Sequence, residues 1–235
     1  MLTKRICIIP ARGGSKRIPR KNIKDFCGKP IIAYSIEKAL ASNLFDEVMV
    51  STDDDEIADI AQQYGAKVPF VRSVKNSDDY ATTYEVIKEV LNQYEKRGQK
   101  FRTVCCIYAT APFISDKNLV DAYRLLQKKN TEAVYTVVPY SYPIQRSLYL
   151  DNSGSLRMNF IENLSARSQD LKTIYHDAGQ FYIYNAQKYL EKRGVFNMSS
   201  KPIILNETEV QDIDNQSDWD IAEMKYRLKK SDEKL

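Results

Sequence analysis

The chain has 235 residues, which is enough for one α/β domain or for a domain with an appendage. Its hydrophobic content of 43% and charged content of 28% are ordinary for a globular protein, and no apolar run approaches the roughly 20 residues that a membrane helix needs. The net charge is +4, and five cations lie within residues 12–21, so the excess indicates a local anionic ligand and argues against a nucleic-acid-binding face.

The cysteines and the first residues predict a cytoplasmic protein. The four cysteines form no CxxC pair, which favours reduced thiols over disulfides or a zinc site. Lys4 and Arg5 precede an apolar stretch of only six residues that ends at a proline, so no signal peptide is expected.

The first element and the loop behind it are the most informative stretch. Residues 6–9 are short, β-branched and uncharged, which predicts a buried strand, so residues 10–22 form a loop at the carboxyl end of a strand, where open α/β sheets bind ligands. Gly13 and Gly14 are expected to take positive φ and to present N–H groups to an anion. The cations beside them are Arg12, Lys16, Arg17, Arg20 and Lys21. We interpret the loop as a phosphate-binding cradle, with a solvated basic loop as the alternative; the GxxxxGK[ST] spacing of a P-loop is absent.

Strands and helices then alternate up to residue 139. The expected strands are residues 46–52, 67–71, 103–108 and 133–139, and the expected helices are about residues 31–40, 55–64, 82–94 and 116–126. Thr82 and Glu85 fit a capping box for the third of these helices, and Asp53 to Asp55 sit where the second begins, so helix capping explains them better than a metal role. The alternation predicts βαβ units and an α/β fold with a mostly parallel sheet.

The pattern breaks after residue 139. Residues 140–177 are polar and irregular, with a hairpin-like turn at residues 152–155, and we expect an extended insertion that contacts a second copy of the chain. Residues 178–235 return to the core with expected strands at 180–184 and 202–205. The last helix is expected to be capped by Ser217 and to turn Ile221, Met224 and Leu228 inward. The chain is therefore divided into a nucleotide-binding core (1–139), the insertion (140–177) and a C-terminal part of the core (178–235).

Several other residues are candidates for chemistry. Asp212 and Asp214 are two residues apart in an extended segment, so both carboxylates should face one side, where they can hold a hard cation; the alternative is a turn whose acids face a helix dipole. Arg72 closes a strand end and could reach a base or ribose, or could lie in a solvated loop. His176 has no legible Ser or Cys partner, which makes a catalytic triad improbable.

The motifs together resemble the acylneuraminate cytidylyltransferase family. The resemblance rests on residues 9–16 (IPARGGSK), Lys21 with Asn22, residues 51–54 (STDD), residues 110–112 (TAP) and residues 212–214 (DID), in order along nearly the whole chain. Residues 76–83 (NSDDYATT) and 177–182 (DAGQFY) look like the pseudaminic acid branch in particular. The sialic acid branch usually has QPTSP where this chain has YATAP at residues 108–112, which argues against N-acetylneuraminate as the substrate.

The resemblance implies a Rossmann-like, three-layer nucleotidyltransferase that is a homodimer, depends on Mg²⁺ (or Mn²⁺) and uses CTP to activate a nine-carbon sugar acid, with pseudaminic acid favoured. By matching position, it implies catalytic roles for Arg12, Lys16, Lys21, Asp212 and Asp214, the last two holding the metal. It implies nucleotide contacts for Ala11, Arg12, Gly13, Gly14, Ser15, Asn22, Arg72, Asp79, Thr82 and Thr83, and sugar contacts for Tyr108, Gln180 and Tyr182. The alternatives are a cytidylyltransferase for N-acetylneuraminate, legionaminate or another sugar acid and, more distantly, a non-catalytic protein that binds nucleotides or nucleic acid.

Overall fold

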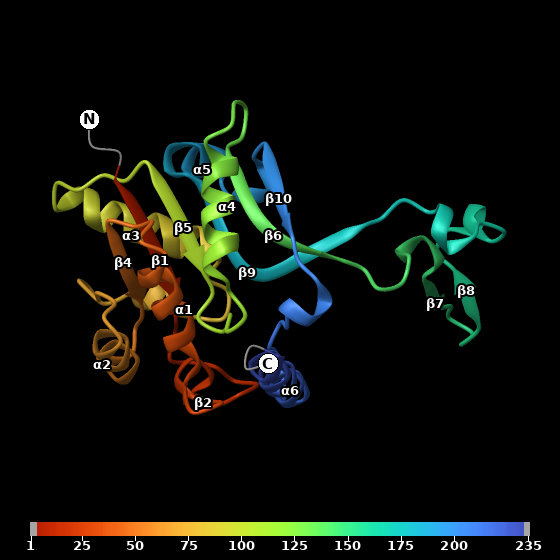
Figure 1. Ribbon diagram of the computed structural model, residues 1–235, viewed down its shortest axis with the longest axis horizontal. Helices are drawn as coiled ribbons and strands as arrows, with labels where there is room; N and C mark the ends of the chain where they lie inside the picture. Colours follow the sequence, from red (N-terminus) through yellow and green to blue (C-terminus); the bar gives the residue numbers. More distant parts are fainter. Residues whose placement is uncertain (1–3, 233–235) are drawn as a thin grey trace.

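A six-stranded sheet forms the centre of the molecule. The computed structural model describes residues 4–232, and its strands lie in the order β10-β6-β9-β5-β1-β4 (Figure 1). Their bounds are β1 (Arg5–Pro10), β4 (Glu47–Ser51), β5 (Thr103–Ile107), β6 (Ala133–Pro139), β9 (Tyr175–Asn185) and β10 (Ser200–Ile204). Only β9 runs antiparallel to its neighbours in this sheet, so the expected mostly parallel sheet is confirmed.

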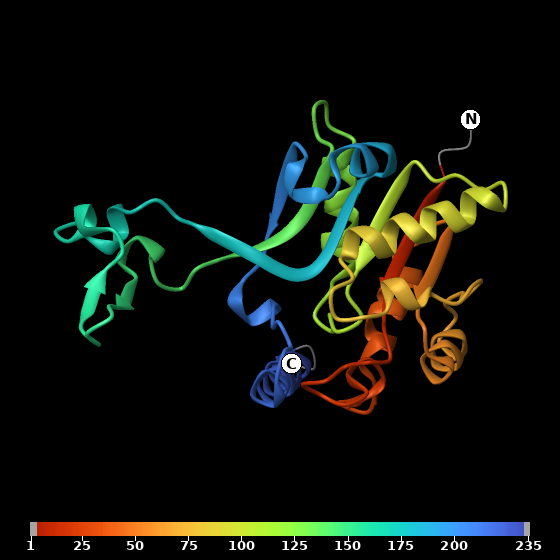
Figure 2. The same cartoon turned by 180° about the vertical axis from the view of Figure 1, so that it is seen from behind.

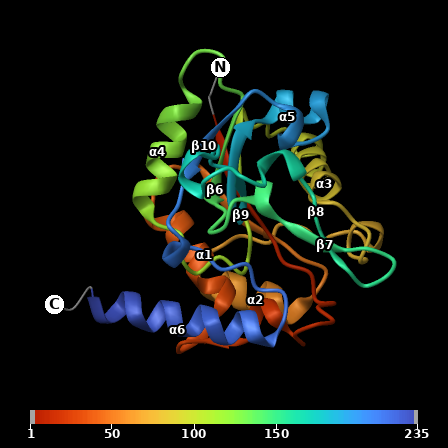
Figure 3. The same cartoon turned by 90° about the vertical axis from the view of Figure 1, so that its right-hand side faces the viewer.

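Helices cover both faces of the sheet and make three layers, as the end-on view in Figure 3 shows. They are α1 (Ile31–Ala41), α2 (Asp55–Gln63), α3 (Thr83–Lys96), α4 (Asp116–Leu126), α5 (Ala186–Lys192) and α6 (Gln216–Asp232). Alternate residues of β1 point to opposite faces: Cys7 and Ile9 pack with α1, α2 and α4, whereas Ile6 and Ile8 pack with α3 and α5. The strand is therefore buried on both sides and holds the loop behind it in a fixed place.

Residues 140–174 form an arm that projects from the sheet. The arm leaves at the end of β6 and returns into β9, and its tip is the hairpin of β7 (Leu148–Leu150) and β8 (Leu156–Met158) (Figures 1 and 2). Gly154 has φ of 78° in the connecting turn, as the hairpin expected at residues 152–155 requires. A second small pair, β2 (Asp25–Phe26) and β3 (Lys29–Pro30), lies between β1 and α1.

Two expectations about secondary structure are wrong. Residues 67–71 form no strand; Lys67 alone bridges to Met49, because Pro69 lacks the N–H that further pairing would use. Helix α6 is capped by Asn215, whose side-chain oxygen accepts the Asp218 N–H at 3.0 Å, and not by Ser217.

The buried face of α6 is also opposite to the one expected. Ile221, Met224 and Leu228 are exposed, whereas Trp219 and Ala222 are buried. They pack in an apolar cluster at the start of α1. Its other members and aromatic neighbours include Phe26, Ile31, Tyr34, Phe113 and Tyr226. Helix α6 packs on this small cluster and not on the sheet, so a single-face pattern in the sequence could not identify its partner.

The cysteines are free thiols, and Cys7, Cys105 and Cys106 are buried. No helix within residues 4–232 is long and apolar enough to cross a membrane.

Candidate active site

The loop behind β1, residues 11–22, is here called the basic loop. It is tied to the core at its start, where the Ala11 N–H donates to the Ser51 carbonyl at 2.9 Å, and in its middle, where Ile18 is buried. The expectation that Gly13 and Gly14 take positive φ is wrong, since neither does. Gly13 is required by space: a Cβ there would lie 2.6 Å from Oδ2 of Asp54. Nothing lies within 4 Å of a Cβ built on Gly14, so that side of the loop is open.

A cavity of about 520 Å³, here called the loop cavity, lies against the basic loop. It collects residues that follow β1 and β5 with residues that precede α3 and α6, so it lies where several chain segments meet. Its lining includes nine of the expected site residues: Arg12, Ser15, Lys16, Lys21, Asn22, Arg72, Asp79, Tyr108 and Asp214. Arg17 and Thr110 complete its polar lining.

Carboxylates partly neutralise the cations of this cavity. Asp79 pairs with Arg12 at 2.8 Å and also with Lys16, and Arg17 pairs with Asp214 at 2.7 Å. Five cations and two carboxylates line the cavity, so positive charge remains in excess. A polyanion such as a triphosphate can compete for these exposed pairs, because surface ion pairs are individually weak.

Lys21 is the most enclosed lysine of the loop cavity. Its Nζ donates to the Ile213 carbonyl at 2.5 Å and lies 4.0 Å from Oδ1 of Asp214. Desolvation lowers the pKa of Lys21, and the Asp214 and Asp212 carboxylates oppose this effect. A bound anion would stabilise the charged form of the amine, so the lysine is suited to meet phosphate.

Arg72 is a buried cation at the end of the cavity. Its Nε donates to Oγ of Ser51 at 3.0 Å, and a terminal nitrogen donates to the Ser51 carbonyl. Burial lowers the pKa of Arg72 to about 10, so the group stays charged near neutral pH. The fixed guanidinium can offer its remaining N–H groups to a ligand, which excludes the solvated-loop alternative for this residue.

A second cavity of about 250 Å³, here called the tyrosine cavity, adjoins the first. Tyr108 lines both cavities, and its ring lies 5.5 Å from that of Tyr182, whose hydroxyl donates to Asp177. The walls are mainly aromatic and apolar: Thr82, Thr83, Tyr84, Cys106, Tyr108, Asp177, Tyr182, Tyr184, Tyr189, Arg193, Gly194, Val195 and Phe196.

Eight expected site residues do not line the loop cavity: Ala11, Gly13 and Gly14, which belong to the basic loop itself, and Thr82, Thr83, Gln180, Tyr182 and Asp212. Thr82 and Thr83 line the tyrosine cavity, and the Thr82 hydroxyl also accepts the Glu85 N–H at 3.3 Å in a capping box that begins α3. Gln180 is buried, donates its amide to the Glu209 carbonyl at 2.6 Å and lines neither cavity. Arg193 and Phe196 also line the tyrosine cavity, and they could not be found from the sequence. No motif surrounds them, and the pairing of β9 with β5 brings this part of the chain near Tyr108.

The two acids that precede α6 line different cavities, which differs from the expectation that both carboxylates face one side. Asp214 lines the loop cavity, and Asp212 lines a neighbouring cavity of about 360 Å³ at the base of the arm, beside His176 and Asp177. Within the described part of the chain, no group of three or more His, Cys, Asp or Glu residues is arranged to hold a metal by itself.

The donor set nevertheless fits Mg²⁺ that arrives with a nucleotide. Mg²⁺ usually binds one or two protein carboxylates together with phosphate oxygens and water. Partial desolvation and then the nearby Asp214 carboxylate raise the pKa of Asp212, and a cation between the two acids would relieve this crowding.

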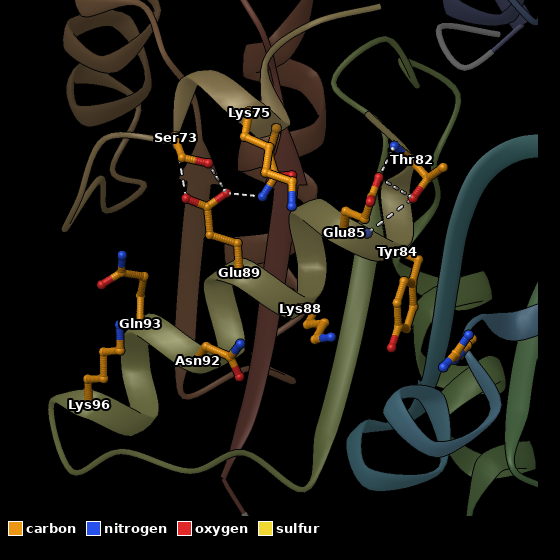
Figure 4. A pocket seen from close by; sticks show the side chains of 12 residues that line it. Ser73, Lys75, Thr82, Tyr84, Glu85, Lys88, Glu89, Asn92, Gln93 and Lys96 are labelled. Carbon is orange, nitrogen blue, oxygen red and sulfur yellow. Dashed lines mark hydrogen bonds between the residues drawn. The ribbon is translucent and has the colours of Figure 1, made fainter. Parts of the chain in front are cut away.

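A further cavity near the site, of about 630 Å³, lies beside α3 and has a structural explanation (Figure 4). Glu89 accepts hydrogen bonds from the Ser73 N–H at 2.9 Å, from the Ser73 hydroxyl at 3.0 Å and from the Asn76 amide. These polar side chains satisfy one another and hold the segment before α3, so the groove is not a candidate site.

Known proteins are similar to this chain in sequence and in fold. The sequence model of a family described as cytidylyltransferase matches residues 6–229. The chain belongs to the cytidylyltransferase family. This cytidylyltransferase is 44% identical over 225 residues to a pseudaminic acid cytidylyltransferase of Campylobacter jejuni subsp. jejuni, with 96% of this chain and 97% of that protein covered. It is 32% identical to a CMP-N,N'-diacetyllegionaminic acid synthase of Legionella pneumophila, with 95% and 96% covered.

The fold is also found among solved structures. A CMP:2-keto-3-deoxy-manno-octonic acid synthetase complexed with CTP superposes with a TM-score of 0.69 at 17% identity, covering 96% of this chain and 99% of that one. At that identity the likeness concerns the fold alone. The expected nucleotidyltransferase fold, the resemblance and the enzyme class are thereby confirmed.

Proposed function

We propose that this cytidylyltransferase joins CTP to pseudaminic acid and releases pyrophosphate. One observation carries the proposal: a cavity with excess positive charge and a cavity with aromatic walls lie side by side and share Tyr108. The first suits a nucleoside triphosphate and the second suits a sugar ring, whose apolar faces pack on aromatic side chains. The 44% identity to a pseudaminic acid cytidylyltransferase over nearly all of both chains supports the choice of sugar.

The reaction requires displacement at one phosphorus atom. The anomeric C2 hydroxyl oxygen of the sugar acid attacks the α-phosphorus of CTP, and the hydroxyl proton passes to solvent. The bond between the α-phosphorus and the oxygen that bridges to the β-phosphate breaks, and pyrophosphate leaves with that electron pair. Such transfers depend on positioning and on compensation of charge. Arg12, Lys16 and Lys21 are placed to offset charge on the α-phosphate and the leaving group.

The remaining polar groups have supporting roles in the proposal. Ala11, Gly13, Gly14 and Ser15 frame the phosphates, and Arg72 and Asn22 contact the nucleoside. Asp79 releases Arg12 and Lys16 when phosphate enters, because it pairs with both in the ligand-free chain. Tyr108 and Tyr182 contact the sugar. Thr82 and Thr83 are placed between nucleotide and sugar, and Gln180 shapes the strand behind them.

Asp212 and Asp214 are the residues proposed to hold Mg²⁺ or Mn²⁺. When bound, the ion supplies positive charge to the phosphate oxygens and acidifies a bound hydroxyl. Desolvation of Asp212 and its proximity to Asp214 support this assignment.

The arm is proposed to make the protein a homodimer. The apolar side chains that its tip exposes are Leu148, Leu150, Leu156, Ile161 and Leu164. Leu148, Leu150 and Leu156 lie on one face of the β7–β8 ladder, and exposed apolar side chains grouped in this way favour a protein–protein contact. On this proposal residues 1–139 and 178–235 form the nucleotide-binding core and residues 140–177 form the dimerisation insertion. Free, buried thiols support a cytoplasmic location.

The direct test incubates the protein with CTP, Mg²⁺ and a panel containing pseudaminic, legionaminic, N-acetylneuraminic and 3-deoxy-octulosonic acids, and identifies products by mass. We expect a CMP-sugar and pyrophosphate, fastest with pseudaminic acid. A faster reaction with another acid would change the sugar but keep the chemistry, and no product with any acid would refute the function.

A further inference from the structure

The two ends of the basic loop are held by the same helix N-terminus. At one end, the Gly13 N–H donates to Oδ1 of Asp53 at 3.0 Å. At the other end, the guanidinium of Arg20 donates to both carboxylate oxygens of Asp54, at 2.5 and 2.9 Å, and also pairs with Glu56. Asp53 and Asp54 are adjacent, and Asp54 is the N-cap of α2, where its side chain accepts the Ile57 N–H at 3.0 Å.

Arg20 occupies this place at a conformational cost. Its φ of 55° and ψ of 29° are in the left-handed region, which glycine adopts freely and residues with a Cβ adopt at a cost. A side chain kept at such a position indicates that its contacts offset the strain. The contacts here are a two-point pair between a planar guanidinium and a carboxylate, which is the strongest common form of ion pair. The pair raises the pKa of Arg20 and lowers that of Asp54.

The pair also leaves no room for a side chain at position 13. The Asp54 carboxylate that Arg20 holds is the group that would meet a Cβ on Gly13 at 2.6 Å. The Asp54 carboxylate therefore lies between Arg20 and Gly13. Ser15, Lys16 and Arg17, which line the loop cavity, lie between these two residues in the chain. Arg20 itself does not line the loop cavity.

We propose that Arg20 is a positioning residue: together with Asp54 it clamps the basic loop in the shape that receives the triphosphate, before nucleotide arrives. The expected effect on CTP binding rests on the proposed function, whereas the clamp itself rests on the contacts of Arg20 and Asp54. A preformed loop saves the free energy of ordering on binding, so loss of the clamp should weaken CTP binding and leave the chemical step nearly intact.

The test compares Arg20→Gly, which keeps the backbone conformation and removes the pair, with Arg20→Lys, which keeps the charge and loses the two-point geometry. Asp54→Asn removes the carboxylate charge while keeping an oxygen that can cap α2. Asn43→Gly is the matched control, since Asn43 also has positive φ (52°) and lies at the end of α1, outside the loop cavity. Arg124→Ala controls for loss of an exposed, ion-paired arginine.

Two measurements are made on each full-length variant: hydrogen exchange of residues 11–22 without ligand, and the Kd and KM for CTP with kcat. We expect Arg20→Gly and Asp54→Asn to exchange faster in the loop and to raise both constants for CTP about 10-fold, with kcat changed less than about 3-fold. Arg20→Lys should fall between them and wild type, and both controls should match wild type.

Unchanged exchange in Arg20→Gly and Asp54→Asn would overturn the clamp, whatever the protein does with CTP. Faster exchange with unchanged CTP constants would overturn the positioning role. If wild-type protein fails to bind CTP while the variants still exchange faster, the proposed function fails and the clamp stands.

Discussion

Lys21 lies between the basic loop and the acids that precede α6. Its enclosure lowers the pKa of its amine, and a bound phosphate would stabilise the charged form. Lys21→Ala should lower kcat by about 10²-fold or more, because it removes a cation from the charge that develops on the phosphates. Steady-state kinetics measure this effect, with Lys117→Ala on the exposed face of α4 as the control. A kcat equal to wild type would remove Lys21 from the mechanism.

Arg17 forms an ion pair with the Asp214 carboxylate, which is one of the two proposed metal ligands. The Arg17–Asp214 pair is largely exposed, so it contributes little by itself, but the ion must displace it. Arg17→Ala should tighten Mn²⁺ binding about two- to five-fold in the presence of CTP, as measured by electron paramagnetic resonance. Arg227→Ala, which breaks a similar exposed pair with Glu223, should have no effect. Weaker Mn²⁺ binding in Arg17→Ala would contradict the metal assignment.

Single residues of the site were predictable where the motif is local. The cations of the basic loop follow a strand directly, so their place at the sheet edge needed only the strand to be recognised. That Asp212 and Asp214 line different cavities was not predictable, because one cavity is formed by the base of the arm and the other by the basic loop. Nor was the reason for Gly13, which is the approach of Asp54 from a different element.

At the scale of elements, α6 positions the proposed metal acids through one buried side chain. Trp219 is 2% exposed and packs in the same cluster as Ile213, the residue between the two acids, whereas Met224 is 62% exposed. Trp219→Ala should lower the free energy of unfolding by about 3–5 kcal/mol, because it leaves a large cavity. Met224→Ala should change it by less than about 0.5 kcal/mol. Urea denaturation measures both losses in the free energy of unfolding. A larger loss for Met224→Ala than for Trp219→Ala would indicate that the apolar stripe in the sequence is the buried face.

The same helix shows the limit of periodicity. Ile221, Met224 and Leu228 form an apolar stripe in the sequence, but the buried residues are Trp219 and Ala222, which lie about 100–180° round the helix from that stripe. When a helix carries two apolar stripes, the sequence alone does not show which stripe is buried, because that depends on the element against which the helix packs. The strands and helices of the first 139 residues were predictable because each has one apolar pattern and a clear cap or stop; residues 67–71 failed because a single proline outweighs a short apolar run.

For the whole molecule, the arm is the part that projects from the sheet, and it exposes apolar side chains at its tip (Figure 1). Leu150 and Leu156 face each other across the β7–β8 ladder and are 67% and 65% exposed. Replacing both with Asp should convert the proposed dimer to monomer, because two charges on each tip must then be buried. Sedimentation velocity measures this, with Ser153→Asp in the hairpin turn as the control. A dimer that survives the double change, or a monomeric wild-type protein, would contradict the proposed role.

The arm could be located from the sequence, since the βα alternation stops at residue 139, but its shape could not. The arm leaves the sheet where the end of β6 pairs with the start of β9, Pro139 opposite Tyr175, and this long-range pairing has no local signal.

The central claim is that the cations around the basic loop recognise the phosphates of a nucleotide. Calorimetry of the wild-type protein with CTP and with CMP, each with Mg²⁺, tests it most directly, because the two ligands share the cytidine and differ in the β- and γ-phosphates. We predict that CTP binds at least about 10-fold more tightly than CMP, as the added charge meets more ion-pair partners. Equal affinities, or no heat with CTP, would contradict the claim.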